Sequence, residues 1–293
     1  MEANELLERY EDGERDFTAV DLTGADFTGA ILVGVNFTQA NLMGANFSRA
    51  FLTKAKFTEA NLHRANFSFA KLPESILRLA DLSKANLNGA FLVKASLFQA
   101  KLTGADLTGV NLRNGNLWGA NLCGANLPFI NLRHANLMGA NLSWANLYSA
   151  KLSGAKLFGA ALTGVNLRKA LLNGIDLGGV DLSGVNLSEA KVSGVNFEGA
   201  NLVAANFRDA QLRSVKFTGA DLAGANLENT CLLRSNLNWA RLYQANLKGA
   251  DLSEATLIGA NLQGTELDGA ILPESTRLYV CMSDWAFNTS ASS

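Results

Sequence analysis

Hydrophobic residues recur at every fifth position, without interruption, from Phe17 to Leu272. These 52 central positions hold 42 Leu, 9 Phe and one Val. Two residues before them runs a second apolar column, which is Ala at 36 of 51 positions from Val20 to Ala270. Asn or Asp separates the two columns in 32 of 52 repeats, and 24 of the 27 glycines stand two residues after the central residue. The chain is therefore a long array of five-residue repeats.

Neither a helix nor a long strand can bury this pattern. Five residues advance an α-helix by about 500°, so an apolar stripe would drift around it. A strand would move the central residue to the opposite face at each repeat. A three-residue extended piece such as Ala-Asn-Leu, followed by a type II turn with positive φ at the glycine position, keeps both apolar columns on one side. Coils of such pieces bury their apolar residues when they stack about 4.8 Å apart.

A twenty-residue period is superimposed on the five-residue one. We name four sides by their first central residues: the Phe17, Leu22, Phe27 and Leu32 sides. Asn or Asp occupies the middle position in 7, 10, 12 and 3 of 13 repeats on these sides, in that order. All nine central Phe residues fall on the Phe17 and Phe27 sides. The sequence therefore predicts a four-sided solenoid of about 13 coils of 20 residues, in which those two sides face each other.

The A(N/D)LxG repeat resembles the pentapeptide-repeat protein family over about nine tenths of the chain. This resemblance implies an all-β fold, a right-handed quadrilateral parallel β-helix. The opening segment from Leu6 to Phe17 also resembles the lead-in of cyanobacterial members, which suggests a cyanobacterial source.

The sequence divides into three parts. Residues 1–15 are predicted to form an N-terminal capping helix, because Leu6, Leu7 and Tyr10 stand at helical spacing within residues 3–11. Residues 16–274 form the repeat β-helix, and residues 275–293 a C-terminal cap and frayed tail. Aromatic residues in that tail are candidate cap contacts or, by resemblance to some family members, homodimer contacts: Tyr279, Trp285 and Phe287.

Composition excludes several classes of function. The net charge is −1, and three scattered cysteines form no disulfide framework, which is typical of a reducing, cytoplasmic compartment. No secretion signal or membrane span is visible in the sequence. His63 and His134 occupy outward corners of different sides without nearby ligand partners, so we expect no metal site. We expect no catalytic residues and no cofactor, because the coil interior is filled and its exterior is flat.

Charge is unevenly spread along the chain. Residues 1–16 carry seven acids and two bases, whereas residues 17–272 carry 22 bases and 17 acids. The net charges of the four sides are +1, 0, −2 and +6, so the excess lies on the Leu32 side. This candidate basic side either keeps the molecule soluble or docks an acidic partner. It comprises Lys54, Lys71, Lys94, Arg113, Arg133, Lys151, Lys191, Arg213 and Arg234.

A second candidate site is a column of large apolar residues at one outward position of the Phe17 side. Their register places them in four consecutive coils, where they form a contiguous apolar strip. Such a strip either protects the ladder beneath it or binds a partner. Its members are Phe98, Trp118, Met138 and Phe158.

These observations favour a non-catalytic, rod-like scaffold or protein-interaction module whose partner is another protein. The alternative is binding of an acidic partner or a nucleic acid through the basic side, and of these two we do not expect nucleic acid. We rank last a DNA mimic that protects topoisomerase. The resemblance includes members of that quinolone-resistance type, but their rods are strongly acidic, whereas this one is net positive.

Overall fold

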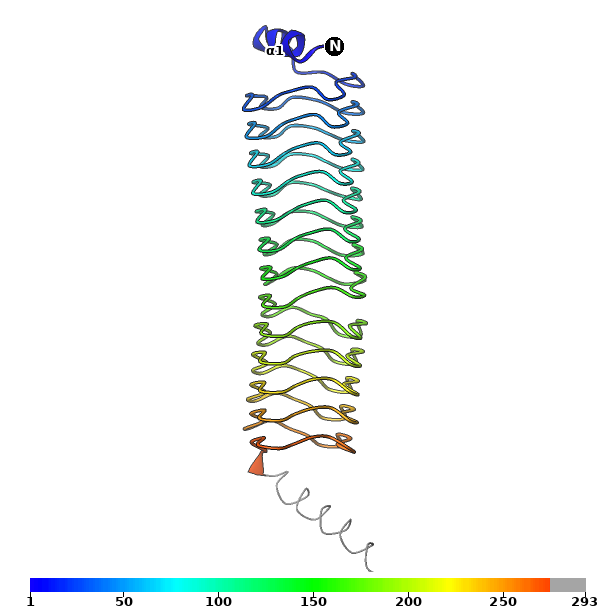
Figure 1. The fold of residues 1–293 in the computed structure, drawn as a ribbon, viewed down its shortest axis with the longest axis vertical. Coiled ribbons are helices and arrows are strands. Elements are labelled where there is room, and N and C mark those ends of the chain that lie inside the picture. The colour runs from blue at the N-terminus through cyan, green and yellow to red at the C-terminus, as the bar shows by residue number, and fades with distance from the viewer. Residues whose placement is uncertain (275–293) are drawn as a thin grey trace, which may run out of the picture. The chain divides into compact units, whose positions relative to one another are not determined.

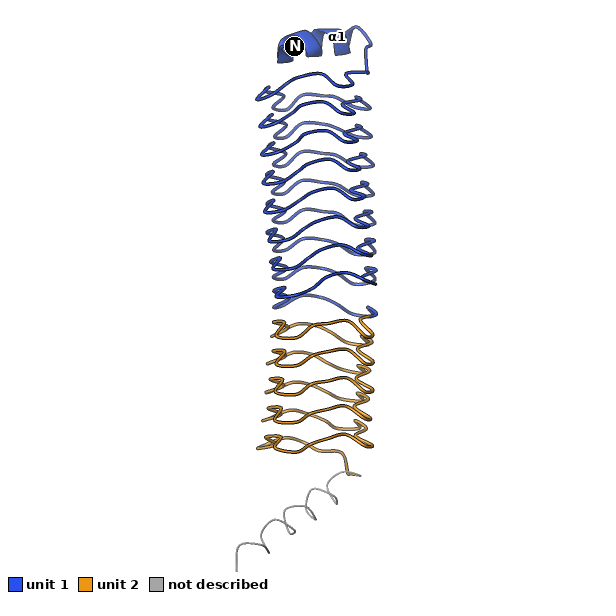
Figure 2. Cartoon of the chain, turned by 90° about the vertical axis from the view of Figure 1, so that its right-hand side faces the viewer, with its two compact units in different colours: residues 1–176 blue, residues 177–293 orange. Residues whose placement is uncertain are grey.

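The computed structural model describes residues 1–274 of the 293-residue chain. The chain forms two compact units, Met1–Asp176 and Leu177–Ser293 (Figure 2). The five-residue phase runs through Asp176 and Leu177 unchanged, so the sequence pattern does not mark this boundary. Each unit is a stack of coils.

In the first unit, coils stack in a register of twenty residues (Figure 1). Asn41 forms parallel bridges to Asp21 before it and Asn61 after it. Its N–H donates to the Val20 carbonyl at 2.8 Å, and its carbonyl accepts from the Leu22 N–H at 2.8 Å. Four turns separate each residue from its bridge partner in the next coil. The twenty-residue period therefore corresponds to one coil of the ladder.

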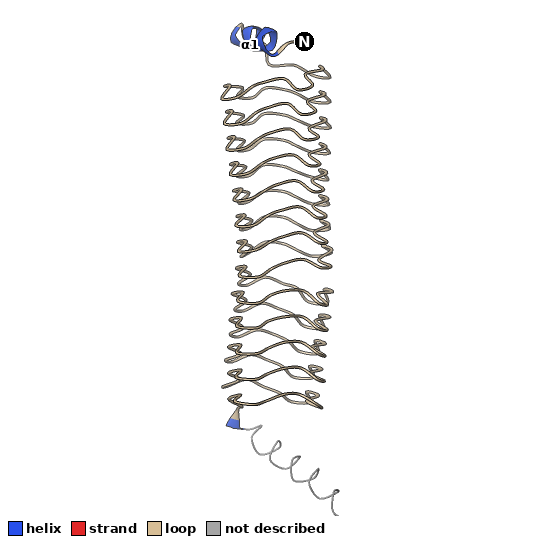
Figure 3. Cartoon of the chain, viewed as in Figure 1, coloured by secondary structure: helices blue, strands red, loops and turns tan. Residues whose placement is uncertain are grey.

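The ladder is built from single residues. Within residues 1–274, no side of a coil forms a strand longer than one residue (Figure 3). We predicted a three-residue extended piece, and the structure differs because the turn begins at the central residue. Ala25 N–H donates to the Leu22 carbonyl at 3.1 Å, so Leu22 is already the first residue of its turn. Only the middle residue of each repeat is left to form the bridge.

Every turn holds its third residue in the left-handed region. The φ values at these 51 positions, from Ala19 to Gly269, lie between 52° and 72°. The predicted positive φ at the glycine position is confirmed, but 27 of the 51 residues are not glycine. None of these is Val, Ile or Thr, the types for which such φ values are most costly.

The core of the first unit contains two facing columns of phenylalanine. Phe47 stacks at 5.0 Å between ring centroids on both Phe27 and Phe67, one coil before and one coil after it. Across the coil it meets Phe57 edge-on at 5.8 Å and 81°. Phe47 and its neighbours are fully buried. The prediction that the Phe17 and Phe27 sides face each other is confirmed in this unit.

The helix α1 (Ala3–Glu11) precedes the first coil, in agreement with the amphipathic segment predicted at residues 3–11. Its Leu6 side chain is fully buried. The Tyr10 hydroxyl donates to the Val33 carbonyl at 2.9 Å. In later coils the corresponding carbonyl accepts from a backbone N–H of the preceding coil. Arg9 forms an ion pair with Glu14 at 2.6 Å after the helix. The helix thus supplies apolar and polar partners to the first coil.

The second unit repeats the same ladder. Its parallel bridges run from Asp181↔Asn201 to Asp251↔Ile271. Phe197 stacks on Phe217 at 5.3 Å and meets Phe207 edge-on at 6.0 Å. The C-terminal cap predicted for residues 275–293 lies outside the described residues.

Candidate interaction surfaces

Asparagine side chains of the ladder hydrogen-bond to their own turns and, in several coils, to the adjacent coil. Asn66 Oδ1 accepts from the Ser68 N–H at 3.0 Å, and Asn66 Nδ2 donates to Asn46 Oδ1 at 3.0 Å. Stacked amides thus bond to one another between coils, and the backbone partner of Asn66 is the turn that follows it. Its side chain therefore braces its own turn and the adjacent coil.

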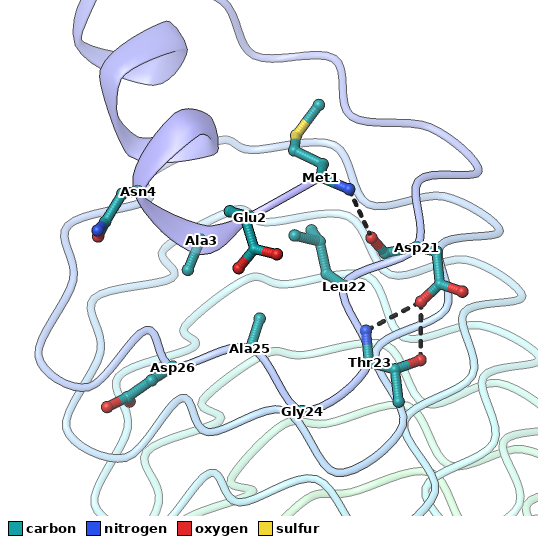
Figure 4. Close-up of a pocket in the computed structure, with 10 residues that line it drawn as sticks. All are labelled: Met1, Glu2, Ala3, Asn4, Asp21, Leu22, Thr23, Gly24, Ala25 and Asp26. Carbon is teal, nitrogen blue, oxygen red and sulfur yellow. Dashed lines mark hydrogen bonds between the residues drawn. The ribbon is translucent and has the colours of Figure 1, made fainter.

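Aspartates in the first coil make the same turn contacts. Asp21 Oδ1 accepts from the Thr23 hydroxyl at 2.7 Å and from the Thr23 N–H at 3.0 Å (Figure 4). These hydrogen bonds, followed by one from Asn41, lower the pKa of Asp21 below its ordinary value. The equivalent bonds from Thr18 and Thr28 lower the pKa values of the two related aspartates, Asp16 and Asp26.

Two open grooves lie between α1 and the first coil. One, of about 500 Å³, is lined by residues that include Met1, Asn4 and Asp26 (Figure 4). The other, of about 460 Å³, is lined by residues that include Tyr10 and Phe27. Their linings combine apolar side chains with carboxylates, and the Thr23 and Thr28 hydroxyls in them donate to Asp21 and Asp26.

Groups suited to metal binding are dispersed. Among residues 1–274, no three His, Cys, Asp or Glu side chains gather closely enough to hold an ion. Cys123 and Cys231 are free thiols and half-buried. Over the same residues, no helix has the length and apolar character needed to cross a bilayer.

The predicted apolar strip lies within the first unit. Phe98 and Trp118 stack at 5.0 Å between centroids and 10° between planes. The Arg78 guanidinium lies 4.8 Å from the Phe98 centroid. Trp118 is 39% exposed and Phe158 is 78% exposed, while Phe98 and Met138 are half-buried. The backbone hydrogen bonds between coils place the four residues in one column, in which two members are exposed and two are half-buried.

The bases of the basic side differ in the groups that they contact. In the first unit, Lys54 pairs with Glu74 at 3.9 Å, and Lys71 lies 4.6 Å from the Phe51 ring centroid. The remaining four bases of that unit are exposed and form no ion pair with any described residue: Lys94, Arg113, Arg133 and Lys151.

In the second unit, two of the three bases on this side have close partners. Arg213 Nε donates to Cys231 Sγ at 3.3 Å, and Arg234 pairs with Glu254 at 2.8 Å. The hydrogen bond and charge of Glu254 raise the pKa of Arg234. Lys191 is exposed.

Sequence reasoning missed a set of exposed aromatic residues at the third turn position. Phe69, Trp144 and Trp239 are 57%, 68% and 65% exposed. Each lies over the glycine twenty residues later, where a Cβ would collide with its ring. The signal available in the sequence was this pairing of a large residue with glycine at a spacing of twenty. The candidate cap or dimer residues Tyr279, Trp285 and Phe287 lie outside the described residues, so that role is still a prediction.

Turns every five residues and a parallel ladder with a register of twenty define the chain as a β-solenoid repeat protein. Models of pentapeptide repeats match residues 21–58, 60–98, 92–128, 129–164 and 235–272, and a model of the pentapeptide repeat region matches residues 157–227. The chain belongs to the pentapeptide-repeat family. Its fold is accordingly a right-handed β-helix, with one short helix before it.

Solved structures of similar proteins come from different organisms. HetL, a pentapeptide repeat protein involved in heterocyst differentiation regulation in the cyanobacterium Nostoc sp. strain PCC 7120, is 32% identical. The match covers 94% of this chain and 98% of HetL, with a TM-score of 0.29. A pentapeptide repeat protein of the Arabidopsis thaliana thylakoid lumen is also 32% identical, over 36% of this chain and 74% of that protein, with a TM-score of 0.21.

The fluoroquinolone resistance protein QnrB1, which is plasmid-mediated, is 18% identical. That match covers 92% of this chain and 98% of QnrB1, with a TM-score of 0.27. No curated protein sequence gave a significant match. Pentapeptide-repeat proteins generally act in protein interaction or as scaffolds rather than in catalysis.

Proposed function

We propose that this chain is a non-catalytic, rod-like scaffold that binds another protein in the cytoplasm. In this proposal it consists of 13 four-sided coils between an N-terminal capping helix and a C-terminal cap. The binding site is the apolar strip formed by Phe98, Trp118, Met138 and Phe158. The observation that supports the proposal is the alignment of four large apolar residues at one outward position of consecutive coils, with Trp118 and Phe158 exposed.

The strip has the properties expected of a binding surface. Its Phe98 and Trp118 rings are held rigidly, because they stack on each other and Arg78 covers one end of the column. Rigid aromatic side chains lose little conformational entropy when a partner binds, and they dominate the energy of many interfaces. A contiguous exposed apolar surface of this kind is uncommon on proteins that have no partner.

A paired-variant capture experiment tests the proposal. Trp118→Asp combined with Phe158→Asp places two carboxylates on the strip without touching the buried columns. We expect partners retained by the wild-type protein from a lysate of its source organism to be lost from this variant. The control is Phe69→Asp combined with Trp144→Asp, which makes the same chemical change at other corners and should retain them. An identical partner set for all three proteins contradicts the proposed site.

Charge argues against the DNA mimic, and a salt titration tests nucleic-acid binding. A DNA mimic needs an acidic surface, whereas residues 17–176 carry 15 bases and seven acids. Nucleic-acid binding through the basic side would make affinity fall steeply with salt. Salt-titrated binding of duplex and single-stranded DNA measures this directly, and we expect no specific complex at physiological ionic strength.

A further inference from the structure

Two corners of the first unit border the same side of the coil. Three exposed bases form a cationic corner at the turns that lead into the Phe17 side: Lys94, Arg113 and Arg133. The apolar strip stands at the turns that leave that side. Each side carries one bridging residue between its two turns, so the two corners are the opposite edges of one narrow face. The surface between them is polar and level, and its middle residues are Ser96, Asn116, Asn136 and Lys156.

The electrostatic character of this region is nearly uniform. Between Asp81 and Asp176 the sequence contains nine Lys and Arg residues and a single acid, Asp106. Asp106 belongs to the Phe27 side, and the core contacts between Phe47 and Phe57 show that this side lies across the coil from the Phe17 side. The composite face therefore presents cations along one edge and apolar groups along the other, with no carboxylate on the described surface between them. Such a face attracts a partner that is both acidic and apolar.

The ring geometry closes the Phe98 end of the strip to the stacking by which single-stranded nucleic acids bind. Stacked bases need an open aromatic face. Trp118 covers one face of Phe98 at 5.0 Å, and the Arg78 guanidinium covers the other at 4.8 Å. The strip thus offers ring edges and aliphatic surface at its Phe98 end, which suit apolar side chains of a protein.

The spacing of the strip distinguishes between partner conformations. Its four residues follow one another at about 4.8 Å, so the strip extends over about 14 Å. An α-helix laid along the stack presents one side-chain row per 5.4 Å turn, or about 16 Å for the same four rows. A strand presents the same face only every 6.6 Å or so, and four rows would need about 20 Å. A helix is also about 10 Å wide with its side chains, so it can cover a face that has one bridging residue between two turns.

We propose that this face binds an acidic amphipathic α-helix of a partner protein, lying along the coil stack. Its apolar stripe, at i, i+3 or i+4, i+7 and i+11, contacts Phe98, Trp118, Met138 and Phe158. Its carboxylates lie beside Lys94, Arg113, Arg133 and Lys156. This inference rests on the proposed scaffold function and specifies the chemistry of the partner.

Site-specific photo-crosslinking tests it in the full-length chain. Met138 is replaced by p-benzoyl-phenylalanine in the source organism, and Thr108 on the opposite side is replaced in the same way as a control. We expect Met138 to crosslink to a protein segment with helical apolar spacing and flanking Asp or Glu, and Thr108 not to do so. A crosslink from Met138 to nucleic acid, or to a segment without that pattern, overturns the inference. So does crosslinking at Thr108 but not at Met138, although this result leaves the scaffold function standing. The absence of any protein crosslink at either position or at other exposed turns removes the scaffold function itself.

A binding titration then tests the charge component. A synthetic peptide of the crosslinked segment is titrated by fluorescence anisotropy with the wild type, with Arg113→Glu plus Arg133→Glu, and with Arg64→Glu plus Lys84→Glu. The last pair occupies the diagonally opposite corner and controls for net charge. We expect at least tenfold weaker binding for the first double variant and less than a threefold change for the second. Equal losses in both would show that only overall charge matters and would overturn the assignment to this face.

Discussion

The pairing of large turn residues with glycines twenty residues later predicts a specific pattern of stability. Gly89 and Gly109 have nearly the same backbone conformation, with φ of 66° and 67°. A Cβ at Gly109 would meet nothing within 4 Å, whereas one at Gly89 would lie 2.6 Å from a ring carbon of Phe69. Replacing each glycine by Ala therefore separates the cost of the left-handed backbone from the cost of the collision.

The magnitudes follow from the two contacts. An L-residue in the left-handed region costs about 1–2 kcal/mol, and this cost applies equally to Gly109→Ala and Gly89→Ala. Carbon atoms in contact normally lie about 3.5–4.0 Å apart, so the Phe69 ring must move by about 1 Å in the second variant. Because Phe69 is 57% exposed, it can swing outward at the expense of its rotamer and its packing, which we place at about 1 kcal/mol.

Equilibrium urea unfolding, followed by far-ultraviolet circular dichroism, measures this difference. With a denaturant dependence of about 2–3 kcal/mol/M, Gly89→Ala should unfold at roughly 0.3–0.5 M lower urea than Gly109→Ala. In a Phe69→Ala background the two variants should coincide, because the colliding ring is gone. Equal midpoints in the wild-type background, or a difference that persists without Phe69, would refute the reasoning.

Three further predictions concern the turns. Replacing three first-coil aspartates by Asn should make the loss of stability in acid less steep. The pKa values of these aspartates are lowered in the folded protein. Their contribution to stability is therefore present above the unfolded-state pKa and is lost as pH falls through the folded-state pKa. The difference between the unfolding midpoints of variant and wild type, measured from pH 7 to pH 2, should stay constant above about pH 4 and shift in favour of the variant below it, and parallel curves would contradict this. The three are Asp16, Asp21 and Asp26. Ala204→Gly should raise stability by about 0.5–1 kcal/mol, because Ala204 has a φ of 55°; a lower thermal midpoint would argue against it. Asn66→Ala should cost about 1–2 kcal/mol through its two lost hydrogen bonds, whereas Asn66→Asp, which keeps the turn acceptor, should lose less in urea unfolding.

Burial and register were predictable because they depend on residue type at fixed spacing. The facing Phe columns and the N-terminal helix follow from periodicity, since Leu, Phe and Ala leave water wherever the backbone permits. The reduction of each strand to one residue was not predictable. It depends on the turn starting at the central residue, a backbone detail that the same apolar pattern leaves open. The boundary after Asp176 also leaves no mark in the repeat.

The register of the repeats located the candidate surfaces, but it did not show which groups their side chains contact. The sequence places Phe98 and Trp118 in one column, yet only the coordinates show that Arg78 covers the free face of Phe98. Similarly, the sequence counts Arg234 as part of a basic side, while the structure pairs it with Glu254. Side-chain partners depend on rotamers, and the five-residue pattern does not specify them. Residues 275–293 lie outside the described residues, so the capping and dimer predictions stand untested.

The ladder of the first unit has a register of twenty residues, whereas its turns recur every five residues. Deletions of twenty and of five residues therefore have different consequences. Deleting twenty residues would leave every side chain on its own face. Deleting five, for example residues 121–125, would keep all apolar columns buried but move each later residue back by one corner. Arg133 would leave the column of Arg113, and Met138 would take its place there. A protein of this design can therefore lose a repeat, fold with an intact core, and still have its binding face cut in two.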